Sequence, residues 1–356
     1  MLFDKEDPEA QRVPITCPYC NGTKIIRRGQ RTKKYGEVQI FYCKGCERKF
    51  TPGISKHRTF PLRLILDALT LYNRLYSLED SAKLVFEKYG IEISRHALTK
   101  WLTDYRGYLP FLRMREYVEK KYDRRKMLEE LRLFHGQIYD FKYHRAKIDL
   151  LLEESFKNYR FRPLREFLEL VIAECPHQIF KESQKRASDY KEIFDLDTVK
   201  IIPKINTASK ITRFVIQAVA NNKLRHEILQ EFMLVNDSVT VATEVPVLLD
   251  YEDVSHFRHQ LNFHVPLELA EGEVITGHID LVQIRNGAIH ILDYKPSAKK
   301  AKPIEQLTIY ALALSRLTTL RLFHFKCAWF DEEDYFEFFP LHVVYKKKSR
   351  RNKRKR

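Results

Sequence analysis

The chain has 356 residues, of which 44% are hydrophobic and 31% are charged, so its apolar content suffices for sizeable cores in two or three domains. Its formal net charge of +16 at pH 7 favours a polyanionic partner, and nine of these charges lie in the basic tail 346–356, KKKSRRNKRKR. The N-terminal stretch MLFDKEDPEAQRV has no signal-peptide core and no apolar run approaches a membrane span, so composition argues against secretion and against a membrane partner.

Two pairs of cysteines follow a flexible N-terminus at residues 1–13. They form two C-x2-C motifs separated by twenty-two residues: Cys17, Cys20, Cys43 and Cys46. Two thiolates three residues apart can bind one side of a tetrahedral ion, and a second pair can complete its coordination. The run Gly36–Tyr42 is typical of a strand leading into the second pair. We therefore predict a zinc ribbon with structural Zn²⁺ over residues 14–56, with disulfides or redox chemistry as the alternative.

Residues 57–110 carry the start and stop signals of short helices. A helical run from Pro61 precedes Ser77, which is typical of a helix N-terminus, and Gly90 ends that second helix. Ser94 then caps a third helix, which presents Arg95, His96, Thr99 and Lys100. This is the outline of a helix-turn-helix whose last helix could enter a major groove. The alternative is a three-helix bundle with a solvated basic face.

A zinc ribbon followed by such a segment resembles the N-terminal targeting region of insertion-sequence transposases, over about residues 14–110. The resemblance implies that this part of the chain locates DNA. It does not extend to a transposase catalytic core, because residues 111–204 indicate mostly helix, rich in aromatic and basic side chains. We predict a helical connector there, either with a packed core or as an arch that stacks on unpaired bases.

The stretch GHIDLVQIRNGAIHILDYK, residues 277–295, reads as two apolar runs around Asn286-Gly287. An Asn-Gly step between alternating runs is a strong signal for a two-residue hairpin loop, which fixes the register. In that register Asp280 faces Asp293 on one side of the strand pair. Like charges at that spacing are destabilising unless a cation lies between them, and Lys295 points to the same side. The pattern predicts a site for a hard divalent ion that also contacts phosphate, and an exposed, inactive hairpin rim is the alternative.

Two further candidate site residues lie upstream of the hairpin. Apolar residues repeat at helical spacing from Ile211 to Val219, and His226 faces inward if this helix runs unbroken through Asn221-Asn222. The run VTVATEVPVLL alternates like a strand, with Glu244 on the face opposite the valines. An inward histidine is more often part of a core than a metal ligand.

Downstream of the hairpin, Pro303 is a favourable first residue for a helix. Gln306 and Tyr310 are four residues apart and therefore share one face of that helix. Such a pair is usually found on a surface, so on its own it does not indicate a functional site.

In their order along the chain, these residues resemble the RecB-like branch of the PD-(D/E)XK nuclease superfamily, which includes CRISPR-associated exonucleases, over residues 205–345. The resemblance implies ligands for Mg²⁺ or Mn²⁺: His226, Asp280, Asp293 and the carbonyl of Tyr294. It also implies further site residues: Glu244, Lys295, Gln306 and Tyr310. Lys295 would assist the attacking water, and the helix pair would support the site and the DNA backbone. Many RecB-like nucleases carry a four-cysteine iron–sulfur cluster, but this region has only Cys327, with Cys175 just upstream, so no iron–sulfur cluster is expected.

The sequence thus predicts an α+β or α/β multidomain chain in six parts. They are the N-terminus 1–13, a zinc ribbon at 14–56, a helix-turn-helix at 57–110, a helical linker at 111–204, a restriction-endonuclease-like mixed β-sheet core flanked by helices at 205–345, and the tail. The expected function is metal-dependent cleavage of duplex or single-stranded DNA in the cytoplasm, on the nucleoid, or in the nucleus of a eukaryotic host. The alternative is a DNA-binding regulator or transposition accessory factor with an inactive nuclease fold.

Overall fold

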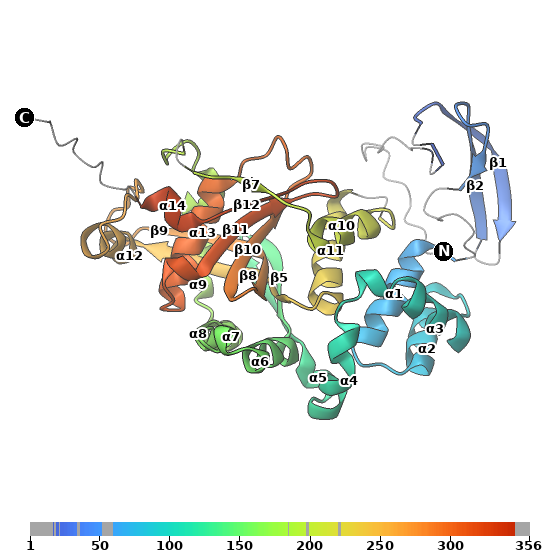
Figure 1. The fold of residues 1–356 in the computed structure, drawn as a ribbon, viewed down its shortest axis with the longest axis horizontal. Helices are drawn as coiled ribbons and strands as arrows, with labels where there is room; N and C mark the ends of the chain where they lie inside the picture. The colour runs from blue at the N-terminus through green and yellow to red at the C-terminus, as the bar shows by residue number, and fades with distance from the viewer. Residues whose placement is uncertain are drawn as a thin grey trace, which may run out of the picture. The chain divides into compact units, whose positions relative to one another are not determined.

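A computed structural model describes residues 17, 19–20, 22–33, 36–51, 60–183, 185–196, 199–219 and 222–345 (Figure 1). The predicted N-terminus 1–13 and basic tail 346–356 lie outside these residues. The chain divides into two compact units: unit 1 comprises 1–124 and 210–238, and unit 2 comprises 125–209 and 239–356. No helix in the described part of the chain is long and apolar enough to cross a bilayer.

The cysteine-rich segment of unit 1 is a small antiparallel sheet. Its strands are β1 (Ile25–Lys33), β2 (Gly36–Cys43) and β3 (Lys49–Phe50), in that order across the sheet. The strand predicted at 36–42 is therefore present. Phe41 and Phe50 pair across β2 and β3, with ring centroids 5.9 Å apart, and form a small core beside the cysteines.

The helices that follow begin and end where the sequence signals indicate. They are α1 (Leu62–Asn73), α2 (Leu78–Tyr89) and α3 (Arg95–Asp104), followed by η1 (Arg106–Tyr108) and α4 (Leu112–Lys121). The hydroxyl oxygens of Ser77 and Ser94 accept hydrogen bonds from backbone N–H groups in the first turns of α2 and α3. Gly90 ends α2 in the left-handed conformation, at φ 64°.

Two later helices contribute to this same unit: α10 (Thr207–Ile216), from residue 210 onward, and the whole of α11 (Asn222–Asn236). The Asn73 side chain donates to Asn236 Oδ1 at 2.8 Å, and the ring of Phe214 stacks on Tyr108 at 4.3 Å between centroids. The condition for an inward His226, one helix running unbroken through Asn221-Asn222, is not met, because α10 ends at Ile216 and α11 starts at Asn222. Asparagine favours helix ends over helix interiors, since its side chain competes for backbone hydrogen bonds.

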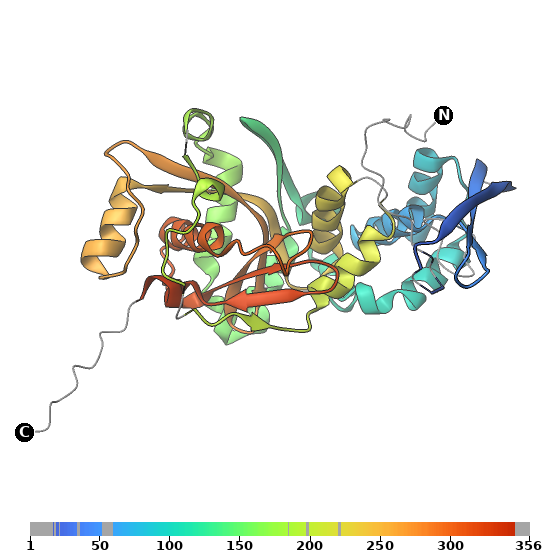
Figure 2. The same ribbon diagram turned by 90° about the horizontal axis from the view of Figure 1, so that it is seen from above.

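Unit 2 is built on a mixed nine-stranded sheet flanked by helices, which is consistent with a restriction-endonuclease-like fold (Figure 2). Eight strands follow one another in the order β4 (Glu129–His135), β5 (Gln137–Tyr143), β8 (Thr240–Asp250), β9 (Val274–Arg285), β10 (Ala288–Tyr294), β11 (Phe325–Phe330), β12 (Tyr335–Phe338) and β7 (Ile202–Pro203). The ninth, β6 (Lys185–Arg186), pairs with β9. Strands β10 and β11 are parallel, and β9 is antiparallel to both β8 and β10.

Helix α13 (Ile304–Leu317) makes the crossover between β10 and β11 and packs against β8, β9, β10 and β11. Most of its residues are buried, as are all seven residues of β10, so the main core lies between this helix and the sheet. The remaining helices are α5 (Arg124–Met127), α6 (Arg145–Glu154), α7 (Phe156–Tyr159), α8 (Arg162–Glu174), α9 (His177–Glu182), η2 (Ala187–Asp189), α12 (Tyr251–Ser255), η3 (His256–Gln260), η4 (Leu322–His324) and α14 (Pro340–Val344).

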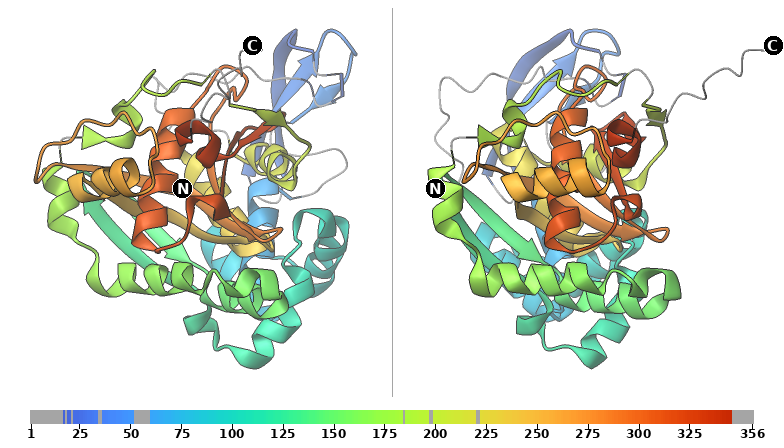
Figure 3. Two further views of the ribbon diagram at one scale, coloured as in Figure 1. Left: turned by 60° about the vertical axis from the view of Figure 1, so that its left-hand side comes forward. Right: turned by 90° about the vertical axis from the view of Figure 1, so that its left-hand side faces the viewer.

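The stretch 111–204 departs from the prediction of a mostly helical connector. It contains the hairpin β4–β5, drawn in green in Figure 3, which extends the main sheet beyond β8. The segment EELRLFHGQIYDFKY alternates polar and apolar residues, and Gly136 forms the turn at φ 77°. Leu133, Phe141 and Tyr143 are buried on the inner face. This two-residue period is a strand signal, and it accounts for the difference from the predicted helix.

Candidate active site

Asp280 and Asp293 lie side by side at the open end of the β9–β10 hairpin. The register is the predicted one: Arg285 pairs with Ala288, Ile284 with Ile289, Val282 with Ile291 and Leu281 with Leu292. The next pair of positions in this register is Asp280 and Asp293. Asn286 and Gly287 adopt φ values of 52° and 69°, as a type I′ turn requires. The hairpin loop therefore determines where the two carboxylates meet.

Asp293 is a buried carboxylate with a negatively charged neighbour. Only 2% of the surface of Asp293 is exposed. Burial and then the charge of Asp280 raise the pKa of Asp293 well above its usual range, and Lys295 offsets only part of this. Lys295 Nζ forms an ion pair with Asp293 Oδ2 at 3.0 Å. One ammonium group beside two carboxylates leaves a local excess of negative charge, which a divalent cation would neutralise.

The position of Asp280 is fixed by the backbone of the neighbouring strand. The N–H of Tyr294 donates to Asp280 Oδ2 at 3.1 Å. The N–H of Lys295 donates to the carbonyl of Phe330 at 3.0 Å, so the start of the loop after β10 is held against β11. These two hydrogen bonds hold Asp280 and Lys295 in place against the paired strands of the sheet.

Glu244 brings a third carboxylate to the same place. Thr243 pairs with Leu281 and Val245 with Ile279, so Glu244 on β8 stands opposite Asp280 on β9. One carboxylate oxygen of Glu244 and one of Asp280 lie within 4.8 Å of each other. The backbone of Glu244 has φ 50°, a left-handed conformation that is unusual inside a strand.

Helix α13 supplies the polar side chains next to this acidic group. Gln306 Nε2 donates to the hydroxyl oxygen of Tyr310 at 2.9 Å. Burial and the nearby charges of Asp280 and Asp293 raise the pKa of Tyr310, so its hydroxyl stays protonated. Its ring packs on the backbone of Gly277, where an added Cβ would lie 2.3 Å from the ring. Glycine is therefore required at position 277 for the tyrosine to approach.

The donor set suits a hard divalent cation. Asp280, Asp293 and Glu244 offer carboxylate oxygens, which Mg²⁺ and Mn²⁺ prefer, and the unbalanced negative charge at Asp293 gives a physical reason for a cation there. Lys295 and Tyr310 add one positive group and one hydroxyl group beside these oxygens. Such a site can orient a phosphate, a water molecule and a metal ion together.

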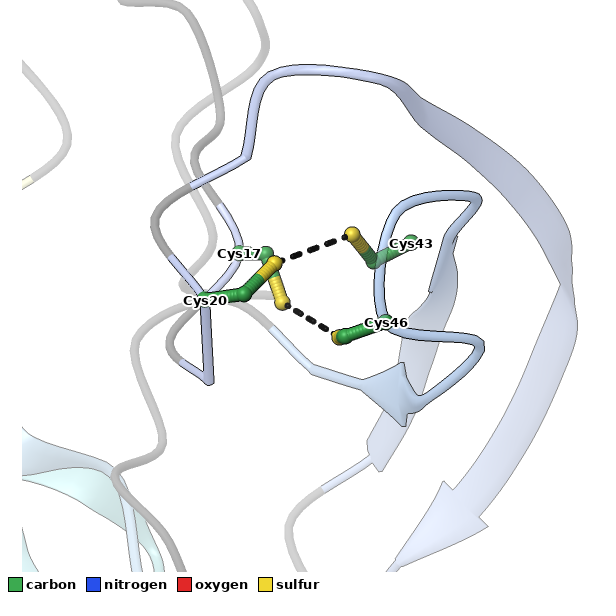
Figure 4. Close-up of side chains that lie close together, drawn as sticks. All are labelled: Cys17, Cys20, Cys43 and Cys46. Carbon is green, nitrogen blue, oxygen red and sulfur yellow. Dashed lines mark hydrogen bonds between the residues drawn. The ribbon is translucent and has the colours of Figure 1, made fainter.

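The four cysteines of unit 1 form a second candidate metal site (Figure 4). Cys17 Sγ lies 3.5 Å from Cys46 Sγ, and Cys20 Sγ lies 3.5 Å from Cys43 Sγ, while all four sulfur atoms lie within 4.8 Å of one another. Sulfur ligands of one tetrahedral zinc ion, with bonds of about 2.3 Å, are about 3.8 Å apart. The cluster therefore fits a structural zinc ion, and its sulfur atoms are too far apart for the disulfides considered as the alternative.

The four residues predicted to contact DNA share the solvent face of α3. Arg95, His96, Thr99 and Lys100 are all exposed, whereas Leu98 and Trp101 on the other face are buried. Arg95 forms an ion pair with Glu79 at 2.8 Å, and Thr99 Oγ1 donates to the Arg95 carbonyl at 3.0 Å. Their role in DNA binding stays a prediction.

His226 lies on α11 of unit 1, whereas the other proposed site residues lie in unit 2. Its role as a metal ligand, like that of the Tyr294 carbonyl, stays a prediction. The fold of unit 2 also brings together three residues for which no sequence pattern predicts a role: His135, Cys175 and His177. The nearest signal in the sequence is the closely spaced Cys175-Pro176-His177, but its partner His135 is forty residues away in a hairpin that was predicted as helix.

Comparison with known proteins finds a family match, and most of the matched residues lie in unit 2. The model of the PD-(D/E)XK nuclease superfamily matches residues 176–334. This range contains Glu244, Asp280, Asp293, Lys295, Gln306 and Tyr310. The match is to the superfamily, and it suggests a metal-dependent nuclease acting on nucleic acid. No curated protein and no solved structure matches the chain.

Proposed function

We propose that this protein is a divalent-metal-dependent nuclease of RecB-like type that hydrolyses phosphodiester bonds in DNA. The observation that carries the proposal is the opposed pair Asp280 and Asp293, with Lys295 3.0 Å from Asp293, inside the range that matches the nuclease superfamily. A hairpin that only formed core would have apolar residues at these two positions. Their placement on two paired strands, β9 and β10, is typical of a preorganised site.

In this proposal Asp280 and Asp293 hold Mg²⁺ or Mn²⁺, and Glu244 adds a further carboxylate. Such an ion polarises the phosphoryl oxygens and lowers the pKa of water. Lys295 keeps an ammonium group next to Asp293, where it can orient the attacking water and compensate charge that develops on the phosphate. Its role depends on a compact point charge, so Lys295→Arg is not a conservative change.

Gln306 and Tyr310 act as positioning residues. Gln306 holds the tyrosine hydroxyl at 2.9 Å, and the buried ring of Tyr310 packs on the strand segment that leads to Asp280. Their side chains thus fix the wall of the site and can support the DNA backbone. His226 and the Tyr294 carbonyl complete the proposed ligand set.

We further propose that unit 1 locates DNA, through a zinc ribbon at the four cysteines and a helix-turn-helix that exposes Arg95, His96, Thr99 and Lys100. The exposed basic face of α3 and the capped boundaries of α2 and α3 support this proposal. Lys100→Glu should weaken binding of duplex DNA about 5- to 100-fold, as expected for one lost contact, and Lys83→Glu, on the exposed side of α2, is the matched control. Equal binding by both variants would contradict a specific role for α3.

The nuclease proposal is tested by cleavage of end-labelled single-stranded and duplex DNA. Metal-depleted full-length protein receives Mg²⁺, Mn²⁺ or EDTA, and wild type is compared with Asp293→Asn and with Asp140→Asn. Asp140 is the control because it lies on β5 of the same sheet and pairs with Arg132 at 2.7 Å, outside the proposed site. We expect wild type and Asp140→Asn to cut with either metal, and Asp293→Asn to be slower by on the order of 1,000-fold or more.

DNA binding by Asp293→Asn is measured in Ca²⁺. If the variant binds DNA as well as wild type does, its loss of cleavage is a loss of the chemical step and not of binding. The end products separate endonucleolytic from exonucleolytic cleavage. If folded wild type binds DNA but cuts none of these substrates with either metal, the nuclease proposal is wrong. The chain is then better described as a DNA-binding regulator or transposition accessory factor.

A further inference from the structure

Unit 2 contains a cluster of nitrogen and sulfur donors that the proposed nuclease site does not use. His135 is the last residue of β4, Cys175 directly follows α8, and His177 is the first residue of α9. One ligand atom from each of the three lies within 4.8 Å of the others. His135 is 1% exposed, Cys175 is half-buried and His177 is exposed, so the cluster reaches from the sheet to solvent.

The separations between these atoms match those of ligands on one ion. His135 Nε2 lies 3.1 Å from His177 Nδ1, and Cys175 Sγ lies 4.0 Å from the same His135 nitrogen. Around a tetrahedral zinc ion, with bonds of about 2.0 Å to nitrogen and 2.3 Å to sulfur, neighbouring ligands are about 3.3 to 3.6 Å apart. The third separation, between the ligand atoms of Cys175 and His177, is within 4.8 Å, so the three donors converge on one place where a single ion could contact all of them.

The orientation of His135 is fixed by its surroundings. Its ring stacks on Phe180 with centroids 4.3 Å apart, and its Nδ1 lies 2.9 Å from His278 Nε2. The ring of His278 stacks in turn on Tyr139, at 3.5 Å between centroids and an interplanar angle of 7°. A hydrogen bond from one ring nitrogen to a neighbouring group is how metal-binding histidines are usually oriented.

The tautomer of His135 decides between two uses of this geometry. If the proton is on Nδ1, it is donated to His278, and the Nε2 lone pair faces His177 and Cys175. If the proton is on Nε2, it is donated to His177, and the histidines form a hydrogen-bonded chain without an ion. A third donor, Cys175, directed at the same nitrogen favours the first use, because a simple chain of histidines needs no thiol there.

We propose that His135, Cys175 and His177 bind a transition-metal ion of the Zn²⁺ class, with His278 as the partner that orients His135. Two imidazoles and one thiolate select zinc-like ions over Mg²⁺, so this site is chemically distinct from the carboxylate group at Asp280 and Asp293. Three protein ligands leave one coordination position for water or another small ligand.

The ion would tie three separate segments of unit 2 together. It joins the end of β4 to the Cys175–His177 segment, and through His278 it reaches β9. His278 and Asp280 are two residues apart, so their side chains share one face of that strand. The metal therefore braces the strand that carries the nuclease carboxylate, but the proposal does not depend on nuclease activity.

Metal content of the full-length protein tests the proposal. Protein is loaded with Zn²⁺, freed of excess metal by dialysis, and measured by plasma mass spectrometry. We expect two zinc ions per chain in wild type, and one fewer in each of Cys175→Ser and His177→Ala. His259→Ala removes an exposed histidine outside the cluster and should leave the zinc content unchanged. His177 is itself exposed, so its replacement should leave the fold intact, which circular dichroism verifies.

A second measurement separates this site from the four-cysteine cluster. In the full-length double variant Cys43→Ser, Cys46→Ser we expect one bound metal ion. Co²⁺ in that protein should give a thiolate charge-transfer band in the near ultraviolet that disappears when Cys175→Ser is added. The proposal is wrong if Cys175→Ser and His177→Ala retain as much zinc as His259→Ala and this band is absent, since the residues then form only a hydrogen-bonded chain.

Discussion

Two buried carboxylates in one sheet, Asp293 on β10 and Glu337 on β12, have opposite electrostatic surroundings. Glu337 is 1% exposed and lies 2.6 Å from Lys204 Nζ, 3.3 Å from Lys326 Nζ and 3.4 Å from Arg285 Nη2. Burial raises its pKa, but the lysines outweigh that effect and the pKa is lowered. In the part of the chain that the structure describes, Asp293 has the carboxylate of Asp280 beside it and Lys295 as its counter-charge, and its pKa is raised.

The difference separates a structural carboxylate from a candidate functional one. The chain supplies all the positive charge that Glu337 needs, so this cluster is complete without a ligand. At Asp293, among the described residues, burial and the charge of Asp280 outweigh Lys295 and raise the pKa, and a bound cation would offset this. The raised pKa of Asp293 and the lowered pKa of Glu337 therefore support a cation site at the first carboxylate and not at the second, as proposed above.

The largest expected effect on stability comes from removing the charge of Glu337. Glu337→Gln leaves Arg285, Lys204 and Lys326 without their shared partner, and should lower the free energy of unfolding by about 3 kcal/mol. Asp293→Asn removes a repulsion instead, so metal-free protein should lose no stability. Urea denaturation of both variants without metal measures the contrast, and an equal loss in both would remove the distinction between the two carboxylates.

A smaller loss should follow from crowding the wall of the acidic site. Gly277→Ala places a Cβ against the Tyr310 ring and should lower the free energy of unfolding by about 2 kcal/mol, with slower DNA cleavage. The cost should shrink in a Tyr310→Ala background, because the ring that causes the clash is gone. Additive effects in the double-mutant cycle would show that the contact is not the cause.

Binding of a cation should stabilise only one of the two carboxylate clusters. At about ten times the dissociation constant, Mn²⁺ should add about 1.4 kcal/mol to the stability of wild type and of Glu337→Gln. Asp293→Asn should show little of this gain. Thermal melts with and without Mn²⁺ provide the measurement, and a matching gain in Asp293→Asn would place the ion elsewhere in the chain.

The smallest expected effect is a pH dependence at Glu337. Its pKa is lowered on folding, so its stabilising contribution is complete above the unfolded value of about 4.5 and is lost as the pH falls through the folded value. The stability difference between wild type and Glu337→Gln should be constant from pH 6 to 8. It should narrow by on the order of 1 kcal/mol as the pH approaches 3.5, as measured by denaturant titrations, and a difference that widened on acidification would have the wrong sign.

Local signals in the sequence predicted the most local parts of the structure. The Asn286-Gly287 turn determined the β9–β10 register, and through it the meeting of Asp280 and Asp293, because a two-residue loop allows one pairing. Ser77 and Ser94 marked helix starts because their hydroxyl oxygens accept a backbone hydrogen bond there, and Gly90 marked a helix end because glycine tolerates the left-handed conformation. The roles of the site residues rest on resemblance and stay predictions.

Features that depend on distant parts of the chain were not predictable in the same way. The β4–β5 hairpin gains its stability from pairing with β8, about a hundred residues later, and the aromatic and basic residues of its surroundings favoured a helical interpretation. The grouping of α10 and α11 with the N-terminal helices depends on contacts such as that between Asn73 and Asn236. The positive neighbours of Glu337 likewise come from three separate segments: Arg285 ends β9, Lys326 lies on β11 and Lys204 directly follows β7.

The backbone at Glu244 sets the ease of folding against the role proposed for its carboxylate. At the hairpin turn, the left-handed φ values of 52° and 69° fall on Asn286 and Gly287, which tolerate them. Inside β8 a φ of 50° falls on a glutamate, where it costs on the order of 1 kcal/mol. Glycine would remove that strain and also remove the carboxylate next to Asp280. A screen for thermostability alone should therefore enrich glycine or asparagine at position 244, and a screen for DNA cleavage should restore the acid.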